Sequence, residues 1–104
     1  MIARIWRGVV RREDAEAYAG YIAETGFAAY GETEGNRGAW MLRRDVDGKT
    51  EFITFSLWED IDAVKAFAGE DHEAAVYYPE DDKFLVERDT KTAHYEVDRY
   101  SMPG

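Results

Sequence analysis

The strongest constraint on the fold of this 104-residue chain is the alternation in residues 50–58, TEFITFSLW. Successive side chains of an extended strand point to opposite sides of a sheet. Two sets therefore separate here: Ile53, Phe55 and Leu57 on one side, and Phe52, Thr54, Ser56 and Trp58 on the other. The period of two predicts a β-strand over this stretch.

The rest of the chain alternates between strand patterns and helix patterns. Strands are expected at residues 2–10, 38–45 and 92–100, with a shorter extended piece at 84–87, and helices at about 13–25 and 61–68. Asp60 is a suitable N-cap for the second helix, and Gly26 and Gly69 are placed to end the two helices. The intervening segments are expected to be a glycine-rich loop at 30–38 and one loose helical turn before Pro79.

The order of these elements is β-α-β-β-α-β. With right-handed crossovers, this order predicts an α+β, ferredoxin-like fold in which a four-stranded antiparallel sheet carries both helices on one face. The first and third strands are expected in the centre of the sheet. The length fits a single domain over residues 1–100, followed by a short flexible tail at 101–104.

Composition excludes several classes of function. The chain has 13 basic and 22 acidic residues, a net charge of -9, which disfavours nucleic acids and anionic membranes as partners. It has no cysteine, so disulfides and thiolate sites are excluded. No segment reaches the ~20 apolar residues of a membrane helix, and no signal-peptide pattern is seen, so a soluble cytoplasmic protein is expected. Known nucleotide, zinc-protease and nucleophile-elbow motifs are missing, the acidic stretches EDHE and PEDD are expected to be solvated turns, and neither cofactor nor metal is predicted.

A sheet with helices on one face leaves its other face open. The strand phasing predicts that the open face carries Trp6, Met41, Phe52 and Trp58. That much apolar surface is best covered by a second copy, which predicts a homodimer. Polar groups of the same face would then lie between the two sheets and form a small-molecule site: Arg4, Arg43, Thr54, Ser56, His94 and Glu96.

The β-α-β-β-α-β order, the block FSLWEDIDAVKAFAGEDHEAAVYYPEDDKFLVE and the closing AHYEV resemble the antibiotic biosynthesis monooxygenase domain family, within the dimeric α+β barrel group. The similarity runs over about residues 2–98 and is most specific over 55–87. This resemblance implies a homodimer and a pocket between sheet and helices. In some members it implies oxidation of aromatic polyketides by O2 without metal or flavin, whereas others degrade haem, isomerise or decarboxylate small molecules, or have no known activity.

The resemblance carries over to individual positions only in part. Characterised members often have a tryptophan at the end of the third strand, a histidine about nine residues later and another about five residues after that. Trp58 matches the first position, Phe67 stands at the second, and His72 falls at the third. Haem-degrading relatives have a tryptophan and then a histidine ligand where this chain has Phe67 and Tyr77, so the haem pattern is not matched.

Two histidines are the candidate catalytic residues. His72 is either a base at the mouth of a pocket or a solvated residue between Asp71 and Glu73. His94 is either a proton acceptor held by Glu96 two residues away, or a neighbour of an ion pair.

That ion pair would join Arg4 to Glu96 across neighbouring strands at the dimer interface. In the alternative, Arg4 is a polar contact for a bound substrate.

Aromatic residues are the candidate substrate contacts. Trp6, Phe52 and Trp58 either stack on a planar substrate or pack at the dimer interface or pocket floor. Tyr77 either donates a hydrogen bond to a substrate oxygen or packs in the core.

The leading hypothesis is a small, cofactor-independent, monooxygenase-like protein that deprotonates a planar apolar substrate for direct reaction with O2. The alternatives are a non-catalytic homodimeric binding or stress-related module and an oxygen-independent isomerase of the same barrel group.

Overall fold

A computed structural model describes residues 1–76 and 78–103 of the chain. It confirms the α+β, ferredoxin-like architecture predicted from the sequence. In chain order the elements are β1 (Ile2–Arg11), a short 3-10 turn (Arg12–Asp14), α1 (Ala15–Glu24), α2 (Gly26–Glu32), β2 (Asn36–Val46), β3 (Lys49–Trp58), α3 (Ile61–Ala68), α4 (Asp81–Phe84), β4 (Leu85–Arg88) and β5 (Ala93–Glu96).

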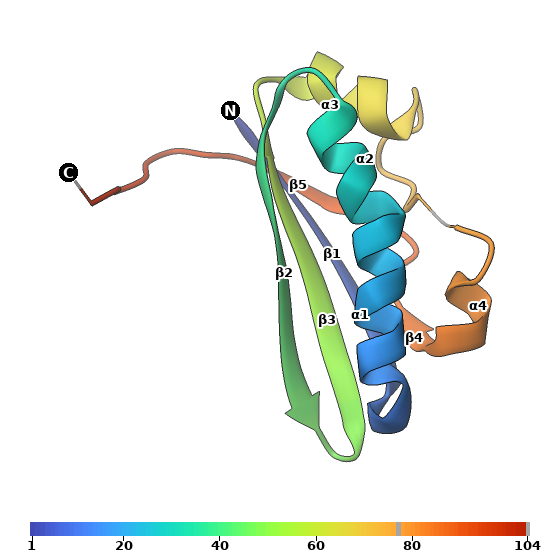
Figure 1. Ribbon diagram of the computed structural model, residues 1–104. Helices are drawn as coiled ribbons and strands as arrows, with labels where there is room; N and C mark the ends of the chain where they lie inside the picture. The colour runs from blue at the N-terminus through green and yellow to red at the C-terminus, as the bar shows by residue number, and fades with distance from the viewer. Residues whose placement is uncertain (77, 104) are drawn as a thin grey trace.

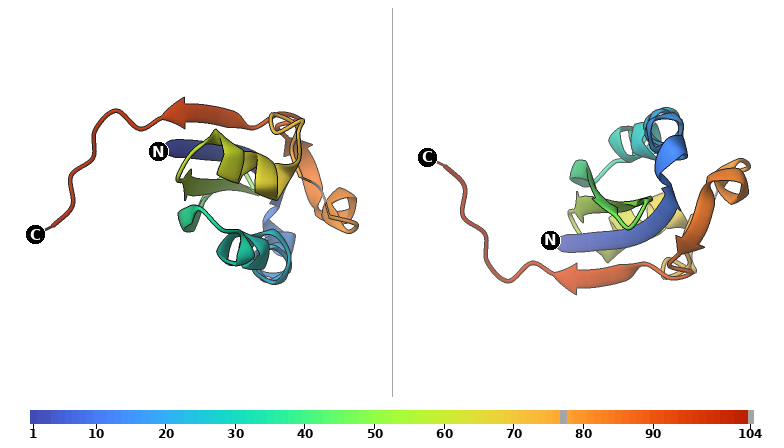
Figure 2. Two further views of the ribbon diagram at one scale, coloured as in Figure 1. Left: turned by 90° about the horizontal axis from the view of Figure 1, so that it is seen from above. Right: turned by 90° about the horizontal axis from the view of Figure 1, so that it is seen from below.

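The sheet is antiparallel and has β1 and β3 in its centre, as predicted. Its order is β2-β3-β1-β4, and β5 also pairs with β1. The position expected for one last strand is therefore shared by two short strands on one edge of β1. β4 pairs with Gly8–Val10 and β5 with Ile2–Ile5. β5 ends at Glu96, earlier than predicted, because Glu96 is opposite Ile2, where β1 begins. Residues 97–103 extend away from the body of the molecule (Figure 2).

The first helix is longer than the sequence suggested. Figure 1 shows α1 and α2 following one another along one face of the sheet. Gly26 does not end this helical segment but begins α2, and the break lies at Thr25, whose φ is -106° and ψ is -98°. The hydroxyl of Thr25 donates to the carbonyl of Tyr21 at 2.7 Å, which satisfies that carbonyl beside the break. The predicted loop at 30–38 is accordingly reduced to the few residues between α2 and β2.

The segment between α3 and β4 also differs from its prediction. Its described residues begin with a turn at Asp71–Ala74, and a bridge then joins Ala74 to Lys91. Part of the expected acidic turn after Pro79 is the short helix α4. Within residues 1–76 and 78–103, no helix is long and apolar enough to cross a bilayer.

The face of the sheet that the helices cover is the opposite of the one predicted. Phe52 and Trp58 are fully buried against the helices, not on an open face. Phe52 packs with residues of β1 and α1, namely Val10, Tyr18 and Ile22. Trp58 packs with residues of α2 and α3, namely Tyr30, Ala63 and Val64. Trp6 and Met41 lie on this helix-covered face as well, because both are opposite Thr54 in the strand register.

The open face is formed by the other set of alternating residues. It carries Ile5, Trp40, Leu42, Ile53, Phe55, Leu57 and Tyr95. The rings of Trp40 and Phe55 are in contact, with centroids 5.6 Å apart. Trp40 is 47% exposed and Leu42 is 52% exposed. The resulting surface has no cover from any helix of the described chain.

Candidate functional site

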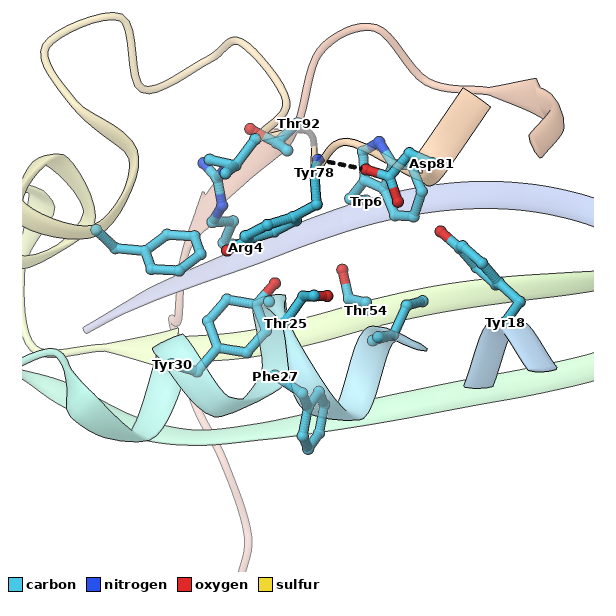
Figure 3. Close-up of a pocket in the computed structure, with 14 residues that line it drawn as sticks. Arg4, Trp6, Tyr18, Thr25, Phe27, Tyr30, Thr54, Tyr78, Asp81 and Thr92 are labelled. Carbon is cyan, nitrogen blue, oxygen red and sulfur yellow. Dashed lines mark hydrogen bonds between the residues drawn. The ribbon is translucent and has the colours of Figure 1, made fainter. Parts of the chain in front are cut away.

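A cavity lies between the helix-covered face of the sheet and the helices (Figure 3). Its volume is about 50 Å³. The sheet contributes Arg4, Trp6 and Thr54; the helices and the segment before α4 supply most of the remaining walls: Tyr18, Ile22, Thr25, Gly26, Phe27, Tyr30, Phe67, Val76, Tyr78 and Asp81, with Thr92 beside them. Most of these side chains are apolar or aromatic, and a few polar groups face the same space, as in small-molecule sites.

Trp6 forms part of the wall on the sheet side, and its position depends on Gly8. The indole folds over this glycine, so that a Cβ at position 8 would lie 2.4 Å from Cη2 of Trp6 and 2.8 Å from Cδ2 of Leu85. Nε1 of Trp6 donates to the carbonyl of Asp89 at 2.8 Å, which anchors the far edge of the ring. Gly8 therefore allows a large aromatic ring to lie close to the strand.

Arg4 is the charged group at one end of the cavity, and it is only 3% exposed. Its Nη1 donates to the backbone carbonyl of His72 at 2.7 Å and lies 2.9 Å from Nε2 of His94. Its Cζ is 5.7 Å from the ring centroid of Phe67. The alternative of an Arg4–Glu96 ion pair is wrong: Arg4 is opposite His94, whereas Glu96 is opposite Ile2. Burial lowers the pKa of Arg4, but an arginine keeps its charge in a protein.

His94 lies against Arg4 on the outer side of the cavity. Its pKa is lowered to about 4 because burial, the charge of Arg4 and the neighbouring His72 all disfavour protonation. The ring is therefore neutral near pH 7. Since Nε2 faces the guanidinium and accepts from it, the proton of the neutral imidazole belongs on Nδ1. His94 thus orients Arg4.

His72 holds Arg4 mainly through its backbone carbonyl. Its carbonyl accepts from Arg4 and also from the hydroxyl of Thr92, at 3.2 Å. Its half-buried ring meets His94 edge to face, with ring centroids 5.1 Å apart. Neither histidine is among the residues that line the cavity.

Asp81 is a cavity residue that sequence reasoning missed. It is 7% exposed, so the expectation that PEDD is a solvated turn is wrong at this position. Its Oδ2 accepts from the backbone N–H of Tyr78 at 2.7 Å, and its own N–H donates to the carbonyl of Tyr78 at 3.0 Å. Burial raises the pKa of Asp81 and, together with the Asp81 charge, that of Tyr18. Tyr78 and Asp81 do not match the Ser/Thr-x-x-Glu/Gln pattern of a capping box, so the sequence carried no local signal for this burial.

The remaining predicted contacts are divided between cavity and core. Trp6 and Arg4 line the cavity, but Phe52 and Trp58 do not and are fully buried. Nε1 of Trp58 donates to Oγ of Ser56 at 2.9 Å, so its polar atom is satisfied inside the core. Tyr77 lies outside the described residues. In the described part of the chain, no group of His, Asp and Glu side chains is arranged to hold a metal ion.

Comparison with known proteins supports the fold. No family model and no curated protein matches the sequence. Among solved structures, a provisionally assigned antibiotic biosynthesis monooxygenase from Bacillus cereus matches with a TM-score of 0.69 and 18% identity, covering 98% of this chain and 97% of that chain. Another from Nitrosomonas europaea matches with a TM-score of 0.67 and 17% identity, covering 95% of this chain and all of that one.

A third similar structure is a mutant of MhuD with two manganese protoporphyrin IX molecules bound per active site. Its TM-score is 0.64 and its identity 17%, with 99% of this chain and 100% of that chain covered. The resemblance to the antibiotic biosynthesis monooxygenases is thus confirmed at the level of the fold. Identities below 20% leave the activity to be argued from the cavity itself.

Proposed function

We propose that this protein binds a small, planar, oxygen-bearing molecule in the cavity and oxidises it with O2 without a metal or flavin. The observation that carries the proposal is the cavity's composition. Aromatic side chains of Trp6, Tyr30 and Phe67 line the space between sheet and helices together with a few polar groups. The similar fold of two provisionally assigned monooxygenases supports the same reaction class.

The proposed chemistry starts with removal of a proton from an acidic methylene group of the substrate. Asp81 is the group placed to accept that proton, because it is a buried carboxyl in the cavity wall and its pKa is raised by burial. The resulting carbanion passes an electron to O2, and the two radicals combine into a peroxide. Loss of water then leaves a carbonyl, so that one methylene group and one O2 molecule become one carbonyl group and one water molecule. One oxygen atom enters the substrate and no external reductant is consumed.

Oxygen consumption tests this proposal. Anthrone-type substrates, which carry the required methylene group, are added to the purified protein, and O2 uptake and product are compared with an anaerobic control. Asp81→Asn is expected to lower turnover by roughly 10²- to 10⁴-fold, the usual contribution of a positioned base. The matched control is Glu80→Gln, which changes the neighbouring exposed acid. Absence of O2 uptake over the whole panel would exclude the oxygenase.

One observation favours a second candidate, a binding module without turnover. The cavity of about 50 Å³ is far smaller than the roughly 300–1,000 Å³ of typical ligand pockets. A substrate the size of anthrone therefore requires the cavity to widen. Tight binding of a small aromatic with no consumption of O2 would identify the protein as this module.

We also propose that the protein is a homodimer that pairs through the open face of the sheet. Trp40 and Leu42 are about half exposed there, beside Ile53 and Phe55. A second copy of the same face is the simplest cover, because a two-fold axis places like residues against each other. The extended C-terminal segment, in which Tyr100 is 72% exposed, supplies further apolar surface.

Sedimentation velocity tests the dimer. The wild type is expected to sediment as a dimer, and Phe55→Asp as a folded monomer, because the new charge would be buried in the interface. Ala23→Asp adds the same charge to an exposed position on α1 and is expected to leave the dimer intact. A monomeric wild type at micromolar concentration would rule this assembly out.

A further inference from the structure

The buried guanidinium of Arg4 has no ionic partner in the described part of the chain. None of the ion pairs there includes it, and its two hydrogen-bond partners, a carbonyl and a neutral imidazole, carry no net charge. Burial lowers the pKa of Arg4, and among the described residues Tyr30, not a carboxylate, acts against that shift. A buried cation without a counter-ion is costly to fold, which makes it a candidate for a ligand's charge.

The hydrogen bonds of Arg4 leave one specific edge of the guanidinium open. Arginine has five N–H donors, and both hydrogen-bond partners of Arg4 are held by Nη1. Nε–H and the two hydrogens of Nη2 therefore remain without a partner among the described residues. Every fully buried side-chain nitrogen or oxygen in that part of the chain has a hydrogen-bond partner. Since Nε and Nη2 of Arg4 have none, these two atoms are accessible from outside the side chain's packing. Nε–H and one Nη2–H are parallel, which matches the two oxygens of a carboxylate.

We propose that the ligand of this cavity is a planar aromatic carboxylate whose two oxygens pair with Nε and Nη2 of Arg4. The inference rests on the proposed function, in that the cavity must admit a small molecule. It adds the chemical class of that molecule and the end of the cavity at which its charged group lies. The apolar body would extend from Arg4 along Trp6 and Tyr30 (Figure 3).

Two other charges must be weighed against this pairing. The protein carries a net charge of -9, but surface charges more than about 8 Å away are largely screened at physiological salt, whereas a contact inside the cavity is not. Asp81 also lines the cavity. It lies beside Trp6, toward Tyr18, away from Arg4 (Figure 3), and the charge that acts favourably on it is Arg88. The local cation therefore decides which ligand charge is favoured at the Arg4 end.

The test compares ligands of the same shape and different charge. Binding of benzoate and benzamide to the full chain is measured by calorimetry, and 1-naphthoate with 1-naphthamide provides a larger pair. The acid is expected to bind roughly ten- to a hundredfold more tightly than its amide, as for a charge-assisted bidentate contact. Both acids should raise the unfolding temperature in proportion to their affinity.

Variants assign the preference to Arg4. Arg4→Met keeps the length of the side chain and is expected to abolish the difference between acid and amide. Arg4→Lys keeps the charge but not the planar guanidinium, and it should retain only part of the difference in affinity between acid and amide. This variant replaces Arg4→Met if Arg4→Met does not fold. Arg37→Met is the control, because Arg37 is an exposed arginine paired with Glu59 and does not line the cavity.

The outcomes separate this inference from the proposed function. Equal affinity for acid and amide in both pairs, no binding of either pair, or a preference that survives in Arg4→Met overturns the carboxylate assignment. A phenolate such as 4-nitrophenolate binding where both carboxylates fail overturns it as well. A clear preference for the acids in a protein that consumes no O2 removes the oxygenase and leaves the carboxylate site standing.

Discussion

The two faces of the sheet are similarly apolar but differ in where their polar groups lie. On the helix-covered face, Phe52 and Trp58 are fully buried, and the polar groups of Arg4 and Thr54 lie between them and the helices, around a cavity. On the open face, apolar residues form a continuous patch, and the charges gather at one end. There Glu51 pairs with Arg7 and Arg44.

This difference underlies the separate proposals made for the two faces. A few polar groups that face an apolar space are typical of small-molecule sites. An apolar patch with its charges at the rim has the layout of a protein–protein interface. The two proposals thus assign the ligand to the helix-covered face, here called the chemical face, and the dimer contact to the open face. Substitutions on the two faces should then have different consequences.

The largest expected contrast is between Trp58→Ala and Phe55→Ala. Trp58 is fully buried among Tyr30 and Phe67, so its removal should cost about 3–5 kcal/mol of unfolding free energy, whatever the protein concentration. Phe55 is only half-buried in one chain, and its removal should cost about 1 kcal/mol or less in dilute protein and more in concentrated protein. Urea unfolding at two protein concentrations measures both. Equal, concentration-independent losses would contradict the division into two faces.

Gly8→Ala probes the chemical face alone. The new methyl group would meet the Trp6 ring at 2.4 Å, so the indole must move and the cavity wall with it. We expect a loss of about 1–3 kcal/mol in stability, typical of overpacking, together with weaker ligand binding. Calorimetric titration and urea unfolding check the two effects. Unchanged binding of an aromatic ligand would mean that Trp6 is not part of the site.

His94→Gln gives a smaller effect that depends on pH. The pKa of His94 falls from 6.5 in the unfolded chain to about 4 in the folded protein. Between these values the unfolded chain binds a proton that the folded protein excludes, so stability decreases as the pH falls from about 6.5 to about 4. The variant should lose less stability over this window. Denaturation series at several pH values measure the slope, and an unchanged slope would argue against burial of a neutral His94.

Glu51→Gln is expected to have the smallest effect, and it reports on the open face. Hydrogen bonds from Arg44 and Arg7 lower the pKa of Glu51. Its contribution is therefore present above the unfolded value of about 4.3 and is lost as the pH falls through the lower folded value. Below about pH 4.3 the unfolding free energy of the variant should fall less steeply with decreasing pH than that of the wild type, and near neutral pH it should change little with pH. A change confined to the His94 window instead would show that the two faces are not independent.

Much of the fold was predictable because its signals are local. The alternation at 50–58 and the apolar spacing around Tyr18 and Ile22 each arise from a few neighbouring residues. The β-α-β-β-α-β order then restricts the topology. The prediction at Gly26 was wrong, because a glycine can end a helix but does not have to, and a longer helical segment here buries Tyr30 against Trp58.

The candidate site was less predictable because it depends on which face is covered. Arg4 and Trp6 were named from their strand, and both line the cavity. Asp81 was missed, because its burial depends on the position of α4 relative to α1, far from it in sequence. His94 was named as a base, but its place opposite Arg4 is a matter of strand register, and this contact makes it a neutral partner of the guanidinium.

The sequence by itself determined that Phe52 and Trp58 lie opposite Ile53 and Phe55, because a strand alternates. It did not determine which pair faces the helices, because both pairs are large and apolar and gain similar free energy from burial. Only the tertiary structure decided that question, by placing Tyr18 and Tyr30 over the first pair. The same choice buried Arg4 with no counter-ion among the described residues and left Trp40 and Phe55 on the open face.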